Sequence, residues 1–281
     1  PRVEEASAPR RPTVYGAPVA RETATGPRGF GWQLEPAADR EPGDVDDHLV
    51  SLLEPTSFAA EQYRAVRLAI ENFRHERGTR VVAIVSPGRG DGRTVTALNV
   101  AGALAQSPEA RVGLVEADLR RPAVARYLGI PPGPGLSSWL LDATMPVDAV
   151  LQRPASVAFA VILAGAASSM PYELLKSPRL AALLAELRER FDYVVVDTPP
   201  VLPFPDVGIL RDLVDGAVLV ARAQRTPREM LRDCLTVVGR QRALGLVFND
   251  DARTAVPGGV AADGDGGWRR YVPRPLGSPR G

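Results

Sequence analysis

Between about residue 50 and residue 250, two hydrophobic periods alternate along the chain. Short runs of β-branched and aliphatic residues are typical of strands buried on both faces, and they predict strands at 81–85, 111–118, 157–163, 193–197, 215–221 and 244–249. The segments between them carry the helical period, which predicts helices at 94–105, 136–141, 179–190, 206–213 and 227–241. This alternation predicts an α/β fold: a doubly wound, mostly parallel sheet with helices on both faces.

One further amphipathic helix is predicted before the first strand, from about residue 58 to residue 73. Thr56 and Ser57 are candidate N-caps for it. A charged cluster of Glu61, Arg64 and Arg67 occupies one side of this helix. The pattern by itself favours a solvated helix face for these three residues.

Both ends of the chain lack a hydrophobic period. Residues 1–47 and 252–281 are rich in Pro, Gly and Arg, and the sequence predicts disordered tails there. We therefore predict that residues 48–251 form the folded domain.

Composition narrows the class of protein further. The chain has 34 basic and 33 acidic residues, a net charge of +1, so no general attraction to nucleic acid is expected. It has 1 cysteine, which excludes a disulfide scaffold and indicates a reducing compartment. No stretch reaches the roughly 18 apolar residues of a membrane span. We therefore expect a cytoplasmic protein without a membrane span of its own and without a nucleic-acid partner.

The most informative stretch is residues 81–99, which predict a strand, a glycine-rich loop and the start of a helix. Such a loop directs backbone amides inward, and together with a helix N-terminus it forms an anion nest for phosphate groups. The usual phosphate loop ends in Gly-Lys-Ser/Thr, but this loop ends in Gly92-Arg93-Thr94 and lacks the lysine. The candidate nucleotide-binding residues of the loop are Gly88, Gly90, Asp91, Gly92, Arg93, Thr94 and Val95.

Polar side chains stand at the ends of several predicted strands. Glu116 and Asp118 lie at the carboxyl end of the second strand, Asp197 ends the fourth, and Asn249 ends the last. In an open parallel sheet these positions converge at one edge, where ligands bind. Mg²⁺ prefers oxygen ligands, and Thr94 offers a hydroxyl beside them. We therefore predict a site for ATP or ADP with Mg²⁺, although any single strand-end carboxylate is often only a cap or a loop partner.

Four segments taken together resemble the bacterial tyrosine kinases, the P-loop cytoplasmic domains that govern capsule and exopolysaccharide assembly. They are Glu61-x-x-Arg64-x-x-Arg67, Ser86–Thr96, Leu114–Pro122 and Val194–Pro200, and the resemblance extends over about residues 50–250. It implies a P-loop NTPase fold, ATP-dependent autophosphorylation on tyrosine, and Mg²⁺ as cofactor. It also implies a homo-oligomer and a membrane-embedded polysaccharide co-polymerase, or chain-length protein, as partner.

The resemblance also assigns roles to individual residues. Arg93 stands where the family has its catalytic lysine, and Glu116 and Asp118 stand where it has two catalytic aspartates. Asp197 stands at the Walker B aspartate, so that Thr94, Asp118 and Asp197 are the implied metal ligands. Asn249 lies where related ATPases contact adenine.

Two further roles concern assembly and phosphorylation. The helix with Glu61, Arg64 and Arg67 corresponds to the family's subunit interface. The family has a cluster of tyrosines near its C-terminus that is phosphorylated by a neighbouring subunit. In this chain the corresponding tail has a single tyrosine, Tyr271, as candidate acceptor.

Three departures from the family pattern affect catalysis. Arginine is a planar fork that does not replace the compact lysine charge, and Glu116 is one methylene longer than aspartate. The tyrosine cluster is also absent. We therefore expect weak or lost phosphotransfer. Two alternatives stay open: a partitioning or septum-placement ATPase, which carries a lysine where Gly88 stands here, and a non-catalytic interaction module of polysaccharide assembly.

Overall fold

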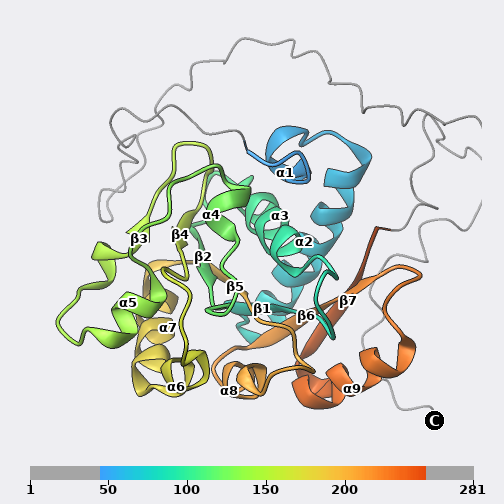
Figure 1. Ribbon diagram of the computed structural model, residues 1–281. Helices are drawn as coiled ribbons and strands as arrows, with labels where there is room; N and C mark the ends of the chain where they lie inside the picture. The colour runs from blue at the N-terminus through green and yellow to red at the C-terminus, as the bar shows by residue number, and fades with distance from the viewer. Residues whose placement is uncertain (1–44, 251–281) are drawn as a thin grey trace, which may run out of the picture. The chain divides into compact units, whose positions relative to one another are not determined.

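The computed structural model describes residues 45–250, which form a seven-stranded sheet between two layers of helices (Figure 1). The strand order is β3-β4-β2-β5-β1-β6-β7, and all neighbouring strands are parallel except β3, which runs antiparallel to β4. The strands are β1 (Val81–Val85), β2 (Val112–Glu116), β3 (Leu151–Gln152), β4 (Ala160–Ile162), β5 (Tyr193–Asp197), β6 (Gly216–Arg222) and β7 (Ala243–Asn249).

The helices are divided between the two faces of this sheet. One face is covered by α1 (Val50–Leu53), α2 (Phe58–Arg77), α3 (Arg93–Ala105) and α4 (Val124–Tyr127). The other face is covered by α5 (Leu136–Leu141), α6 (Pro171–Lys176), α7 (Pro178–Arg190), α8 (Asp206–Arg211) and α9 (Arg228–Val238). Two short 3₁₀ helices, η1 (Val147–Ala149) and η2 (Arg240–Arg242), lie in the connections.

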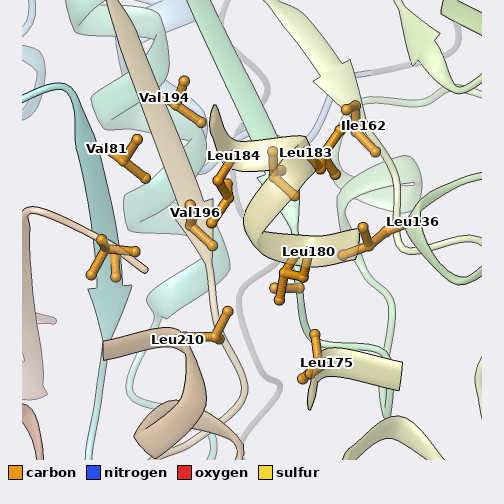
Figure 2. Close-up of a cluster of buried hydrophobic side chains, with 14 of the residues drawn as sticks. Val81, Leu136, Ile162, Leu175, Leu180, Leu183, Leu184, Val194, Val196 and Leu210 are labelled. Atoms are coloured by element: carbon orange, nitrogen blue, oxygen red, sulfur yellow. The ribbon is translucent and has the colours of Figure 1, made fainter. Parts of the chain in front are cut away.

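Successive residues of each central strand enter two different cores. In β1, Val81, Ala83 and Val85 face α5–α9, whereas Val82 and Ile84 face α1–α4. Figure 2 shows the first of these cores, in which leucines of α6, α7 and α8 point toward Val81, Val194 and Val196 on the strands. Burial on both faces explains why these strands are uninterrupted apolar runs in the sequence.

The predicted α/β architecture is confirmed, but the short helices α1, α4 and α6 and the margin of the sheet were not predicted correctly. The expected strand 157–163 is reduced to Ala160–Ile162 in β4, and the two residues of β3 were not anticipated. A two-residue strand is too short to have a period of its own, so its place depends on the neighbouring strand. Among the described helices, none has the length and apolar content that crossing a membrane requires.

The helix predicted from residue 58 begins as expected and continues to Arg77. Ser57 is its N-cap and accepts a hydrogen bond from the Ala60 amide at 3.2 Å, while Gly78 ends the helix in the left-handed region with φ +71°. The tail segments 1–44 and 251–281 lie outside the described residues, and so does Tyr271. Asp46, which falls within the N-terminal tail predicted from sequence, donates its amide proton to the Tyr127 carbonyl at 2.9 Å.

Candidate functional site

The loop between β1 and α3 is held in shape by its own glycines and by the end of β7. Gly90 and Gly92 adopt φ values of +79° and +96°, which side-chain-bearing residues rarely reach. A Cβ atom at Gly92 would lie 1.9 Å from Asn249 Nδ2. That amide nitrogen donates a hydrogen bond to the Asp91 carbonyl at 3.1 Å, so Asn249, at the end of β7, stabilises the conformation of the loop.

Asp91 fastens the same loop to the connection between β6 and α9. Its carboxylate accepts hydrogen bonds from the Gly88 amide at 2.9 Å and from the Thr226 hydroxyl at 2.8 Å. A cavity of about 260 Å³, lined in part by Arg222 and Arg225, lies between the loop and this connection. Both carboxylate oxygens of Asp91 are thus used within the protein.

Arg93, in the place of the usual lysine, is buried, and its guanidinium is bound to the protein. Its Nε donates to the Thr198 carbonyl at 2.8 Å, and its Nη1 donates to Ser86 Oγ and to the Gly88 carbonyl, each at 2.7 Å. Its Nη2 lies 3.6 Å from Asp118 Oδ2. The side chain therefore joins the loop to the segment after β5. The prediction that Arg93 holds phosphate stays a prediction.

Thr94 and Asp197 meet at the edge of the sheet. Thr94 Oγ1 donates to Asp197 Oδ2 at 2.7 Å, whereas Asp197 Oδ1 is buried without a hydrogen-bond partner. Burial raises the pKa of Asp197 to about 7, although Arg93 and Thr94 oppose the rise. A buried carboxylate oxygen with a free lone pair beside a hydroxyl fits Mg²⁺, which takes one or two protein oxygens and keeps several waters.

Asp118 lies close to this pair and is oriented by the backbone that follows it. Its Oδ1 accepts hydrogen bonds from the amides of Arg120 at 3.2 Å and Arg121 at 3.1 Å. Burial raises the pKa of Asp118, and the positive charges of Arg93 and Arg89 oppose this rise. Asp118 is thus an oriented carboxylate whose affinity for a proton exceeds that of an exposed aspartate.

Glu116 is arranged differently from the other two carboxylates. One oxygen accepts hydrogen bonds from the amides of Ala123 and Val124, the latter at 2.8 Å, and the other accepts from the Ala164 amide at 2.9 Å. Burial raises its pKa, and these hydrogen bonds oppose the rise. Glu116 therefore caps α4 and ties it to the end of β4. Its predicted catalytic role stays a prediction, and these contacts favour a structural one.

No group of three or more His, Cys, Asp or Glu side chains within residues 45–250 converges on a single metal position. The oxygens at the sheet edge that fit a cation are those of Thr94 and Asp197. The proposed metal set of Thr94, Asp118 and Asp197 therefore depends on phosphate and water oxygens to complete a coordination shell.

The charged side chains of the cluster on α2 form ion pairs and hydrogen bonds with other residues of the same chain. Arg64 pairs with Glu61 and donates to Gln106 Oε1 at 3.3 Å, while Arg67 pairs with Glu71 at 2.7 Å and donates to the Ala103 carbonyl at 3.0 Å. Both arginines therefore fasten α2 to α3, which differs from the solvated face that the pattern by itself favoured. A subunit contact through Glu61, Arg64 and Arg67 stays a prediction.

An ion pair beside the loop, together with the aromatic ring that it contacts, was not predicted from the sequence. Arg120 forms a bidentate ion pair with the buried Asp206, at 2.7 and 3.1 Å, and its guanidinium lies 4.0 Å from the ring centroid of Phe204. The guanidinium of Arg89 lies 5.4 Å from the same ring. The only signal was an acidic residue at the start of a predicted helix, which does not identify its partner 86 positions earlier in the chain.

Sequence comparison shows which known proteins the chain is similar to. The ParA family model, described as the NUBPL iron-transfer P-loop NTPase, matches residues 77–251. The chain is 33% identical over 204 residues to the tyrosine-protein kinase YwqD of Bacillus subtilis, covering 72% of this chain and 85% of YwqD. It is 33% identical over 201 residues to the succinoglycan biosynthesis transport protein ExoP of Rhizobium meliloti, covering 69% of this chain but only 25% of ExoP.

Comparison with solved structures distinguishes between a tyrosine kinase and a partitioning ATPase. The kinase domain of the Escherichia coli tyrosine kinase ETK matches with a TM-score of 0.69 and 26% identity, covering 75% of this chain and 82% of that domain. A ParA family ATPase from Chlorobium tepidum matches with a TM-score of 0.50 and 20% identity, covering 62% of this chain and 77% of that protein, which shows the shared fold alone. The tyrosine-kinase interpretation is therefore favoured over the partitioning ATPase. The chain belongs to the bacterial tyrosine-kinase family of ParA-type P-loop NTPases.

Proposed function

We propose that this chain is a nucleotide-binding tyrosine-kinase domain of exopolysaccharide or capsule assembly, with weak or lost phosphotransfer. The observation that carries the proposal is the contact of Thr94 Oγ1 with Asp197 Oδ2 at 2.7 Å, beside an Asp197 oxygen that has no partner. A hydroxyl at the start of α3 and a carboxylate at the end of β5 are the protein groups that P-loop enzymes place around Mg²⁺.

Each residue then has a role. Thr94 and Asp197 would hold Mg²⁺ directly or through water, and the amides of the loop would hold the phosphates of ATP or ADP. Asp118 accepts the proton of the tyrosine hydroxyl, and its raised pKa favours this role at neutral pH. Mg²⁺ held there would supply positive charge beside the transferred phosphate.

Two features explain the reduced transfer. The lysine that would reach the phosphates is replaced by Arg93, whose donors bind Ser86, Gly88 and Thr198. Glu116, at the second acidic position, is bound to backbone amides. Removing one preorganised charge contact from an active site costs about 10²–10³-fold in rate, and two such losses bring turnover below detection.

Two further parts of the proposal concern assembly and location, and they are supported by the relatives. We propose a homo-oligomer at the cytoplasmic face of the membrane, attached to a membrane-embedded polysaccharide co-polymerase or chain-length protein. ExoP, whose name refers to succinoglycan biosynthesis and transport, is about four times as long as the segment that matches this chain, since the match covers 25% of it. The membrane-embedded function of such a protein would therefore reside in another segment or in another chain.

Calorimetry with Mg·ADP tests nucleotide binding, and we expect weak but saturable heat that is lost in Asp197→Asn. Absence of heat at millimolar nucleotide would overturn this proposal. Incubation with Mg·ATP followed by intact-mass measurement tests transfer, and we expect little or no added phosphate. Robust phosphate addition that disappears in Tyr271→Phe and in Asp118→Asn would instead identify a fully active kinase.

One observation favours the non-catalytic alternative. The guanidinium of Arg93 donates to the Gly88 carbonyl and lies 3.6 Å from Asp118, where it can take the place of a bound cation. An interaction module of this kind would bind its membrane partner without nucleotide. The same calorimetry distinguishes the two functions, because only the kinase-like domain requires Mg·ADP binding.

A further inference from the structure

We propose that Arg89, at the tip of the phosphate loop, is the cation that contacts the terminal phosphate of bound ATP in place of the missing lysine. The inference rests on the proposed nucleotide-binding function and adds a ligand contact that neither the loop motif nor the family pattern assigns. It follows from what the two loop arginines contact.

Arg93 has little freedom to follow a ligand. Three of its hydrogen bonds go to protein oxygens, those of Ser86, Gly88 and Thr198, at 2.7–2.8 Å. Its side chain is 9% exposed. Contact with a phosphate would require breaking buried hydrogen bonds to carbonyl oxygens, which would then be left unsatisfied. Arg93 therefore links the loop to the segment that follows β5.

Arg89 has the opposite surroundings. It is exposed, it lies between Gly88 and Gly90, and it forms neither an ion pair nor a hydrogen bond with any other described residue. Its one specific contact is with the ring of Phe204, 5.4 Å from its guanidinium. A cation–π contact at an exposed site is weak, so the side chain can exchange it for a charge-assisted contact with phosphate.

Phe204 links Arg89 to a second arginine, Arg120. The ring also lies 4.0 Å from the guanidinium of Arg120, whose side chain is fixed by the buried Asp206. The backbone amide of Arg120 in turn donates to Asp118 Oδ1 at 3.2 Å. A chain of contacts thus connects the Arg89 guanidinium to the carboxylate proposed to activate tyrosine. Burial raises the pKa of Asp118, and the positive charge of Arg89 is among the charges that oppose this rise.

The test compares two nucleotides that differ only in the terminal phosphate. Arg89→Gln should weaken binding of the non-hydrolysable imido analogue of ATP, with Mg²⁺, by about 10-fold or more, as for the loss of one charge-assisted contact. Binding of Mg·ADP should change by less than about twofold, because ADP lacks that phosphate. Calorimetry measures both affinities without depending on turnover.

Three variants make the comparison specific. Arg89→Lys keeps the charge and should recover part of the lost affinity, while Phe204→Leu removes the ring contact that Arg89 gives up on binding phosphate and should not weaken binding of the ATP analogue. Arg232→Gln, an exposed arginine on α9, is the matched control and should change neither affinity. Equal losses for both nucleotides in Arg89→Gln, or no loss, would overturn the inference while leaving the proposed function intact. If the unaltered chain binds neither nucleotide, both fall.

Discussion

Arg93 Nε donates a hydrogen bond to the carbonyl oxygen of Thr198 at 2.8 Å, across 105 positions of sequence. This bond joins the first residue of α3 to the segment that leaves β5, and thereby the two halves of the candidate site. The Thr198 carbonyl that Arg93 binds is buried and the Gly88 carbonyl is partly buried, so the residue contributes to the stability of the loop as well as to its charge.

Replacing Arg93 by lysine separates these two contributions. Arg93→Lys should lower the melting temperature of the nucleotide-free protein by several degrees, because lysine cannot reach all three oxygens at once. It should also tighten Mg·ADP binding, because the compact ammonium of the usual phosphate loop is restored. Thermal unfolding and calorimetry measure the two effects. Unchanged nucleotide affinity would mean that position 93 lies away from the phosphates.

We expect Glu116 to stabilise the fold and not to bind the nucleotide. Glu116→Gln presents an NH₂ group to amides that require an acceptor, so it should destabilise the protein by about 1–3 kcal/mol. Mg·ADP affinity should stay within about twofold of the unaltered protein. Urea unfolding and calorimetry provide the two readouts, with the exposed Glu109→Gln as control. Full stability combined with lost nucleotide affinity would restore the catalytic or ligand-binding role.

The ion pairs of Asp192 predict a pH dependence of stability. Although burial acts to raise it, hydrogen bonds from Arg111 and Arg74 lower the pKa of Asp192 to about 2. The unfolded chain has the ordinary value near 4, so this carboxylate stabilises the fold above pH 4 and loses the effect as pH falls toward 2. The side chain is partly exposed, and we expect about 1 kcal/mol.

Urea unfolding of Asp192→Asn tests this prediction. The variant should be less stable than the unaltered protein at pH 7, and the difference should disappear as pH approaches 2. Asp212→Asn, in which an exposed carboxylate is removed, is the control and should show a smaller difference at neutral pH. A deficit that stays constant down to pH 2 would mean that the Asn variant loses packing and not charge.

Substitution of Arg64 and Arg67 on α2 tests whether these residues contribute to oligomer formation. If Arg64 and Arg67 contribute to a subunit contact, Arg64→Ala with Arg67→Ala should shift the protein toward monomer in light scattering. The double variant also loses the contacts to Gln106 and Ala103, so circular dichroism must first show that it is folded. Arg77→Ala, exposed at the end of the same helix, is the control. Identical masses for all three proteins would leave these arginines as links between α2 and α3 alone.

Much of the fold could be predicted from local pattern. Runs such as Val81–Val85 are buried on both faces, so every residue is apolar and the strand is visible in the sequence. Tyr193–Asp197 is likewise buried throughout, and its only charged residue is the carboxylate at its end. The glycines of the loop were also informative, since only glycine readily reaches the φ values of Gly90 and Gly92. The short β3 was invisible because two residues have no period.

For the site, the sequence determined which chemical groups lie at the carboxyl edge of the sheet, because strand ends and glycine loops are local features. Only the tertiary structure decided what each group contacts. Glu116 and Asp118 are two positions apart, yet Glu116 binds the amides of α4 and β4 whereas Asp118 lies near Arg93. Arg89 and Arg93 likewise differ in burial and partners. The physical reason is that decisive hydrogen-bond partners come from segments 48, 105 and 158 positions away, and no local pattern records contacts over such distances.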